Sequence, residues 1–349
     1  MATESSKAAL SYILDDTLPR EEPLDYITDF DERCDMFDEW HRMQQKYGGS
    51  MTPAAVGIAM IAPLDRLRAF TEELQTQDHS EFSVSTVPGL LDNLCLSSAD
   101  ALSICMAKAS NFYFQVSYPL DVPGPQGFDL SSHEKQPEKE KGCSGVCIVT
   151  GTSEAECARV FPYSKTCACR RSPIETTLRM FWGEERAALW IANFNDNAFM
   201  KSPKNTMFLD TELHWWFVNA KVAFKPLPGD DPHTIELQLH WLKDSTFQDF
   251  KKPIDEDVDF VIQAGLGGTQ GRKTWGHRVY STKSGQPIET GQIYRLWAEN
   301  TDELPSRDML ELQWDLLRVA AIAGADGADD EFAVEDSDVE PLQLDQEKQ

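Results

Sequence analysis

The segment 234–242 alternates between apolar and polar side chains, and this period of two excludes an amphipathic helix over these residues. Because successive side chains of a strand point to opposite faces of a sheet, the pattern predicts a half-buried strand. Shorter patterns predict strands at 277–282 and 292–299, and a short strand and turn at 145–151. The two faces of the main strand consist of Ile235, Leu237, Leu239 and Trp241 on the apolar side, and Glu236, Gln238 and His240 on the polar side. Nothing in the pattern decides whether His240 points to solvent or to a cleft.

Apolar side chains at helical spacing predict helices in the N-terminal part of the chain. We expect one helix to end at the glycine pair 48–49, where the periodic pattern stops. We interpret His41, which lies on the apolar face of that helix, as a hydrogen-bonded core residue rather than a ligand. The stripes of the two predicted helices are Ile27, Phe30, Cys34, Phe37 and His41, followed by Leu64, Leu67, Phe70 and Leu74.

Three more helices are predicted after residue 142, mixed with the strands. They cover 178–193, 210–225 and the segment from Ser306 to Gly324. Asp210 is the expected N-cap of the second helix, and Pro226 is its expected terminator. Eight of the nine tryptophans lie between residues 182 and 314, so we expect the principal core there. The mixture of helices and strands indicates an α+β fold class.

The charge of the chain is strongly acidic and unevenly distributed. The 349 residues carry a formal net charge of −26 at pH 7, which disfavours nucleic acid as a partner because phosphates are repelled at long range. Residues 143–225 are slightly basic, whereas 326–349 hold ten acidic residues and one lysine. We therefore expect a mainly helical region at 1–142, a second domain at 143–325 and a disordered acidic tail at 326–349.

The sequence also bears on the compartment and on metal binding. No segment approaches the 18–20 consecutive apolar residues of a membrane span, and the N-terminus lacks a secretory signal, so we expect an intracellular protein, cytoplasmic or nuclear, without a membrane partner. The cysteines are then most simply free thiols. The alternative is a zinc site, for which the candidate ligands are Cys143, Cys147, Cys157, Cys167 and Cys169. Of the two cysteine pairs, only Cys143 and Cys147 have the spacing that is usual for zinc ligands. The glycine-rich segment 265–274 lacks the G-x-x-x-x-G-K-[ST] phosphate-loop pattern because Arg272 intrudes, and we expect a flexible loop.

Several ordered motifs between residues 143 and 325 carry a family resemblance. They are CIVTG, ECARVFPYS, NTMFLDTELHWW, TIELQLHWL and the closing stretch that begins HRVYSTKSGQPIETGQIYRLW. Together they resemble the HNH endonuclease-type proteins that are common in filamentous fungi. The resemblance implies a ββα-metal core, here extended by antiparallel strands and a C-terminal helix, with the N-terminal helical region packed on it. It also implies a histidine general base on the first strand, an asparagine that orients it, and a metal-binding histidine on the helix.

Carried over residue by residue, the resemblance assigns two of these three roles. Asn205 matches the orienting asparagine, and His214 matches the helix ligand. The general-base position holds Arg159, whose guanidinium stays protonated and cannot accept a proton near neutral pH. Neither Ala158 nor Val218 supplies a further ligand, and one histidine is a poor metal site. We therefore expect no cofactor, with His214 as the ligand if a divalent metal is bound.

These substitutions favour loss of the nuclease chemistry and reuse of the scaffold as a small-molecule enzyme of fungal specialised metabolism. Arg159 would then anchor an anionic or polar group of the substrate, and His214 would act as acid or base beside Asn205. Trp215 and Tyr163 would line the substrate site. Two alternatives stay open: an active metal-dependent endonuclease, and a non-catalytic interaction module. His214 could also be a structural residue that borders the apolar stripe of its helix.

Overall fold

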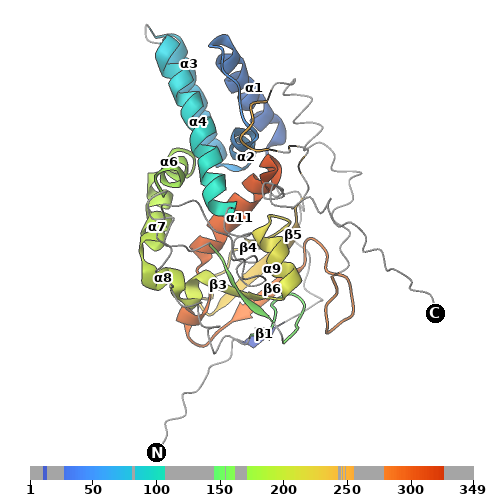
Figure 1. The fold of residues 1–349 in the computed structure, drawn as a ribbon. Helices are drawn as coiled ribbons and strands as arrows, with labels where there is room; N and C mark the ends of the chain where they lie inside the picture. The colour runs from blue at the N-terminus through green and yellow to red at the C-terminus, as the bar shows by residue number, and fades with distance from the viewer. Residues whose placement is uncertain are drawn as a thin grey trace, which may run out of the picture.

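The computed structural model describes the backbone of residues 11–13, and residues 27–80, 83–106, 145–153, 155–161, 171–242, 245, 247, 249–254 and 279–325. Helices gather at one end of the molecule and most strands at the other, with α11 (Arg307–Ala323) running between them (Figure 1). The mixed composition confirms the α+β class. The linker 132–141, the loop 265–274 and the tail 326–349 lie outside the described residues.

Within the N-terminal region, the described residues between 27 and 106 are mainly helical, whereas Ser11–Ile13 form a strand. The two predicted helices are α1 (Phe30–Lys46) and α3 (Leu64–Asp78), and His41 is buried on α1 as expected for a core residue. Pattern analysis missed α2 (Pro53–Ile61), because all nine of its residues are buried and it therefore shows no amphipathic stripe. Thr52 caps this helix through Ala55 N–H, and α4 (Ser83–Met106) follows α3.

The remaining chain forms two antiparallel sheets among short helices. The larger sheet has the strand order β1-β6-β5-β4, and β2 pairs with β3 in a separate two-stranded sheet. The strands are β1 (Ser11–Ile13), β2 (Glu156–Arg159), β3 (Thr206–Leu209), β4 (Val222–Pro226), β5 (Thr234–Trp241) and β6 (Ile293–Trp297). The helices are α6 (Arg171–Trp182), α7 (Glu184–Asn195), α8 (Asn197–Lys201), η2 (Pro203–Asn205), α9 (Thr211–Val218), η3 (Thr301–Glu303) and α11.

Four of the predicted elements differ from the structure. The predicted helix at 178–193 is two helices, α6 and α7, separated by Gly183 at φ +85°. The predicted helix at 210–225 ends at Val218, and its second half is strand β4. The segment 145–151 forms a turn and one isolated bridge rather than a strand. Of 277–282, the described residues form only the bridge from Tyr280 to Pro287.

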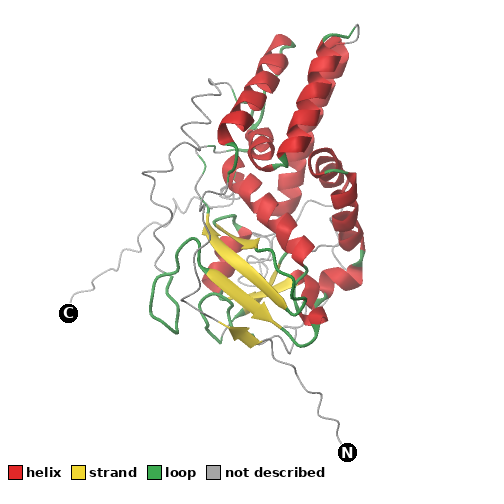
Figure 2. Cartoon of the chain, turned by 180° about the vertical axis from the view of Figure 1, so that it is seen from behind, coloured by secondary structure: helices red, strands yellow, loops and turns green. Residues whose placement is uncertain are grey.

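The predictions for β5, β6 and α11 are confirmed in type and position, with Ser306 and Gly324 flanking α11. On the polar face of β5, Gln238 and His240 are nevertheless buried, while Glu236 is half-buried. Trp314 of α11 lies 4.9 Å from the ring centre of His240, whereas Trp216 of α9 packs at 5.0 Å on Trp241 of the opposite face. The larger sheet, seen from behind in Figure 2, therefore lies between α9 and α11 at β5.

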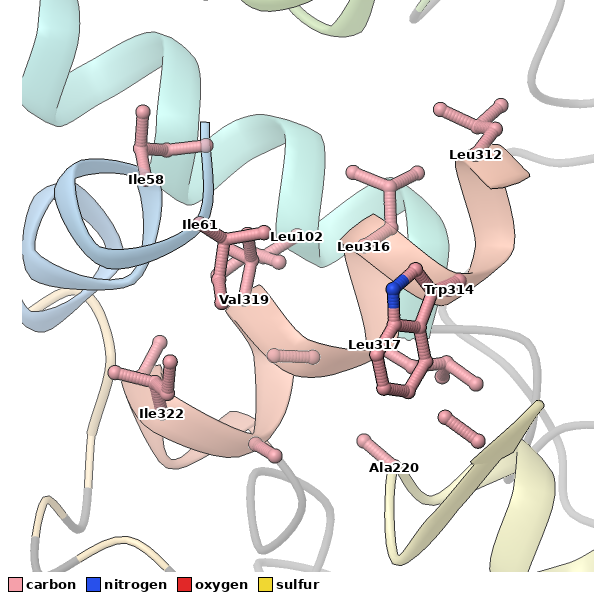
Figure 3. Packing of buried hydrophobic residues seen from close by; sticks show 14 of the residues in the cluster. Ile58, Ile61, Leu102, Ala220, Leu312, Trp314, Leu316, Leu317, Val319 and Ile322 are labelled. Carbon is pink, nitrogen blue, oxygen red and sulfur yellow. The ribbon is translucent and has the colours of Figure 1, made fainter. Parts of the chain in front are cut away.

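The core is one continuous hydrophobic cluster that joins the N-terminal helices to the sheet, rather than a core confined to 182–314. Helix α11 is its centre, since it packs on α2 and α4 as well as on β4 (Figure 3). Buried Arg33 of α1 donates to the carbonyl oxygens of Ala59 and Ala62 at 2.9 and 2.8 Å, which satisfies the C-terminal end of α2. No helix in the described part of the chain is long and apolar enough to cross a membrane.

Candidate functional site

The candidate site is built on the paired strands β2 and β3 and on helix α9; α6, α7, α8 and η2 lie between β2 and β3 in the chain, whereas α9 follows β3 directly. Glu156 of β2 pairs with Leu209 of β3, and Arg159 pairs with Thr206 at the other end. Only Asp210 separates β3 from α9. This strand–strand–helix arrangement holds Asn205, Arg159 and His214 within one small unit of the fold.

Asp210 holds the start of α9 against the turn at 147–150. Its Oδ1 accepts the N–H of Leu213 at 2.9 Å, as predicted for an N-cap, and its Oδ2 accepts the Thr150 hydroxyl at 2.8 Å. The Cys147 thiol lies 3.5 Å from the same carboxylate oxygen, and burial raises its pKa. Cys147 is therefore a packed thiol rather than a reactive one.

The predicted zinc candidates lie only partly within the described residues. Cys147 and Cys157 are free cysteines, and Cys143, Cys167 and Cys169 lie outside the described part. Among the residues that the structure describes, no three His, Cys, Asp or Glu side chains are grouped to hold a metal ion.

His214 is buried on α9 and makes a polar contact with a carboxylate that sequence reasoning missed. Its Nδ1 lies 2.8 Å from Oε2 of Glu156, and the Thr211 hydroxyl donates to Oε1 of the same group at 2.8 Å. Donation by Nδ1–H to the carboxylate makes Nε2 the basic nitrogen of the neutral ring. The His214 side chain is 8% exposed and that of Glu156 is 42% exposed, so the pair reaches solvent through the carboxylate.

A sequence signal for Glu156 existed in the strand alternation. Glu156 and Ala158 share one face of β2. Because Ala158 is fully buried, this face of the β2–β3 sheet packs against the rest of the protein. A carboxylate on the packed face of a strand that precedes a helix with a buried histidine is a candidate partner for that histidine.

Asn205 is fully buried and holds the main chain that leaves β2. Its Oδ1 accepts the N–H of Phe161 at 2.8 Å, and its Nδ2 donates to the carbonyl oxygens of Phe161 at 2.9 Å and Met200 at 3.2 Å. These bonds determine the path of the backbone just after Arg159. Asn205 thus positions the main chain beyond the end of β2.

Arg159 and His214 make their contacts on different faces of the two-stranded sheet formed by β2 and β3. Arg159 is half-buried, and its Nη1 donates to the Thr206 hydroxyl at 3.1 Å, across the strand pair. Three residues of a strand span about 10 Å, and an odd separation places the two side chains on opposite faces. Arg159 is therefore remote from the Glu156–His214 contact, and the structure does not bring all the predicted site residues together in one contact.

The two residues predicted to line a substrate site have different outcomes. Trp215 is 43% exposed on the outer side of α9, while the neighbouring Trp216 is buried against Trp241. Tyr163 lies outside the described residues. His240, which the sequence left between solvent and a cleft, is 1% exposed in the core.

A polar cavity of about 370 Å³ lies near the end of the β2–β3 sheet at which Arg159 pairs with Thr206. One of its walls is Lys204, which directly precedes Asn205, and another is the N-terminal end of α11 around Arg307. Three carboxylates also line it, so its charge is mixed: they are Asp230, Asp231 and Asp308. Neither His214 nor Trp215 belongs to its wall.

Comparisons of the chain with known proteins found no relative. No protein-family model, no curated protein and no solved structure matches the chain.

Proposed function

We propose that the chain is an HNH nuclease-like protein that has lost metal-dependent nuclease chemistry and acts as an enzyme on a small molecule with an anionic or polar group. The observation that carries this proposal is the 2.8 Å contact between His214 and Glu156. A carboxylate that accepts from Nδ1 fixes the orientation of the imidazole ring, and an oriented histidine beside a carboxylate is the arrangement of a general base or acid.

Two further observations support loss of the nuclease chemistry. Arg159 stands where the family resemblance requires a proton acceptor, and its guanidinium donates to Thr206. In the described part of the chain no third metal-binding side chain accompanies Glu156 and His214. A phosphodiester needs a cation that stabilises developing charge, and a single histidine–carboxylate pair is a poor set of ligands for such a cation. Placement in fungal specialised metabolism rests on the resemblance alone.

A non-catalytic interaction module is the second candidate, and one observation favours it. The His214 side chain is only 8% exposed, and His214 does not line the cavity of about 370 Å³. A histidine–carboxylate pair in that setting could simply hold α9 on β2. The two candidates differ in whether His214 is needed for turnover or only for stability.

The test has a nuclease arm and a metabolite arm. In the first, plasmid DNA is incubated with the full chain and with Mg²⁺, Mn²⁺, Zn²⁺ or Ni²⁺, and we expect no nicking. In the second, the chain is incubated with a metabolite extract of the organism that produces it, and compounds that are consumed or formed are followed by mass spectrometry. We expect a change that is lost in His214→Ala and reduced in Glu156→Gln.

His79→Ala is the matched control, because His79 is an exposed histidine at the end of α3 and lies outside the site. This variant should keep the wild-type metabolite change. Metal-dependent nicking that His214→Ala abolishes would overturn the proposal in favour of an active endonuclease. Folded variants with no His214-dependent turnover of any metabolite would favour the interaction module.

A further inference from the structure

His240 is a titratable group in the interior that the proposed function does not use. Its ring is 1% exposed on β5, and Nε2 lies 2.8 Å from Oε1 of Gln238, which is itself fully buried. The other ring nitrogen, Nδ1, is buried and has no hydrogen-bond partner among the described residues. A neutral ring with a bare acceptor nitrogen tolerates this position, whereas a protonated ring would bury an unsatisfied N–H donor.

The charged groups that face His240 are unfavourable to a second positive charge. Lys225 of β4 lies on the same face, since it pairs with Gln238, and Arg318 approaches from α11. The Arg318 guanidinium stacks at 4.2 Å on the ring of Trp314, which in turn packs on His240. Burial lowers the pKa of His240 to about 4, and both cations act in the same direction.

The carboxylates of this face are already engaged. Asp315 of α11 forms an ion pair with Arg318 and accepts the indole N–H of Trp182 at 2.8 Å. Glu236, further along β5, pairs with Arg295 of β6. Glu236 and Asp315 are therefore already paired with arginines, and the charges that act on the pKa of His240 are those of Lys225 and Arg318.

The position of the ring gives its protonation a structural consequence. The His240 ring packs at a tilt against the ring of Trp314, and α11 is the helix that packs on both the sheet and the N-terminal helix α2. A charge placed between β5 and α11 therefore acts on the contact that joins the two halves of the described fold. This device concerns the core and is independent of the proposed function of His214.

We propose that His240 makes the packing of α11 on the sheet sensitive to pH: the neutral ring holds the contact, and protonation of the ring opens it. A ring freed from the core has a pKa near 6.5, above the folded value of about 4. The open state therefore binds more protons between these values, and the closed state is lost as pH falls from 6.5 toward 4. From the two pKa values, the opening constant should rise about 60-fold between pH 7 and pH 4.5.

The experiment is hydrogen–deuterium exchange of the full chain at pH 7 and pH 4.5, corrected for intrinsic exchange rates. Peptides that cover α11 and β5 should show the rise in opening, while peptides that cover α3 should not. His240→Phe keeps an aromatic ring against Trp314 but cannot titrate, so its α11 peptides should lose the pH response. His79→Phe, at an exposed histidine, should retain the wild-type response.

Each outcome decides the proposal. An equal pH response in wild type and His240→Phe overturns it, and so does a rise that is uniform over every peptide, because that would be global unfolding. If His240→Phe does not fold, the ring of His240 is titrated by NMR in the wild-type chain. A folded-state midpoint at or above 6.5 then overturns the proposal, and a midpoint well below it supports the proposal.

Discussion

Replacing Gly57 by alanine should destabilise the protein, although helix propensity alone predicts the opposite. Gly57 lies inside α2, and an alanine in an ordinary helix interior is about 1 kcal/mol more favourable than glycine. The tertiary structure opposes this gain because α2 and α11 touch at this residue. A Cβ built on Gly57 would lie 2.7 Å from the carbonyl oxygen of Val319 and 3.0 Å from its Cγ1.

The magnitude follows from which of these atoms can move. The 2.7 Å contact is to backbone in the middle of α11, so relief requires α2 and α11 to separate in the part of the core that Figure 3 shows. Overpacking of a close-packed core costs about 1–3 kcal/mol, which exceeds the propensity gain. Since the propensity gain offsets about 1 kcal/mol of this cost, we expect Gly57→Ala to lower the free energy of unfolding by up to about 2 kcal/mol.

The assay is urea unfolding, followed by tryptophan fluorescence and far-UV circular dichroism. Gly89→Ala is the matched control, because Gly89 also lies inside a helix, α4, but a Cβ there meets nothing within 4 Å. This control should be neutral or up to about 1 kcal/mol more stable. Adding Val319→Ala to Gly57→Ala should recover little, since the carbonyl oxygen remains. Equal stabilisation by Gly57→Ala and Gly89→Ala would refute the close approach of α2 to α11.

Three further substitutions test individual contacts by the same urea assay. Asn205→Ala should cost about 2–4 kcal/mol, because it leaves the buried N–H and carbonyl of Phe161 without their side-chain partner; a change below 0.5 kcal/mol would contradict that role. Arg33→Leu should cost about 2–3 kcal/mol by leaving the carbonyl groups at the end of α2 unpaired, and its hydrogen exchange should increase there first. Asp210→Ala should cost about 1–2 kcal/mol through loss of the α9 cap and the Thr150 bond, whereas Asp210→Asn should keep most of the stability.

The candidate site shows how far pattern reasoning extends. The motifs of the family resemblance led to Asn205 and His214, and the structure places Asn205 just before β3 and His214 on α9, where Asn205 makes buried hydrogen bonds and His214 a partly buried one. The partner of His214 was not visible in a motif, because Glu156 belongs to a strand 58 residues earlier in the chain. Likewise, spacing alone could not show that Arg159 and Glu156 occupy opposite faces of β2, since that depends on the register with β3.

Local pattern was sufficient where one element buries one face. The period of two at β5, the helical stripe of α11 and the cap at Asp210 each depend on a few neighbouring side chains, and each was predicted in place. Tertiary structure decided the rest. The helix after Asp210 ends at Val218 because the next residues complete a sheet with β5, and apolar residues suit either conformation.

The same physical reason explains the buried polar residues. Gln238 and His240 follow the alternation of an exposed face, yet α11 covers them from more than 70 residues away. A sequence determines which side chains share a face of a strand, because backbone geometry sets that period. Which of two faces meets another element, and therefore which polar groups lose water, depends on contacts between distant segments and is decided only when the chain packs.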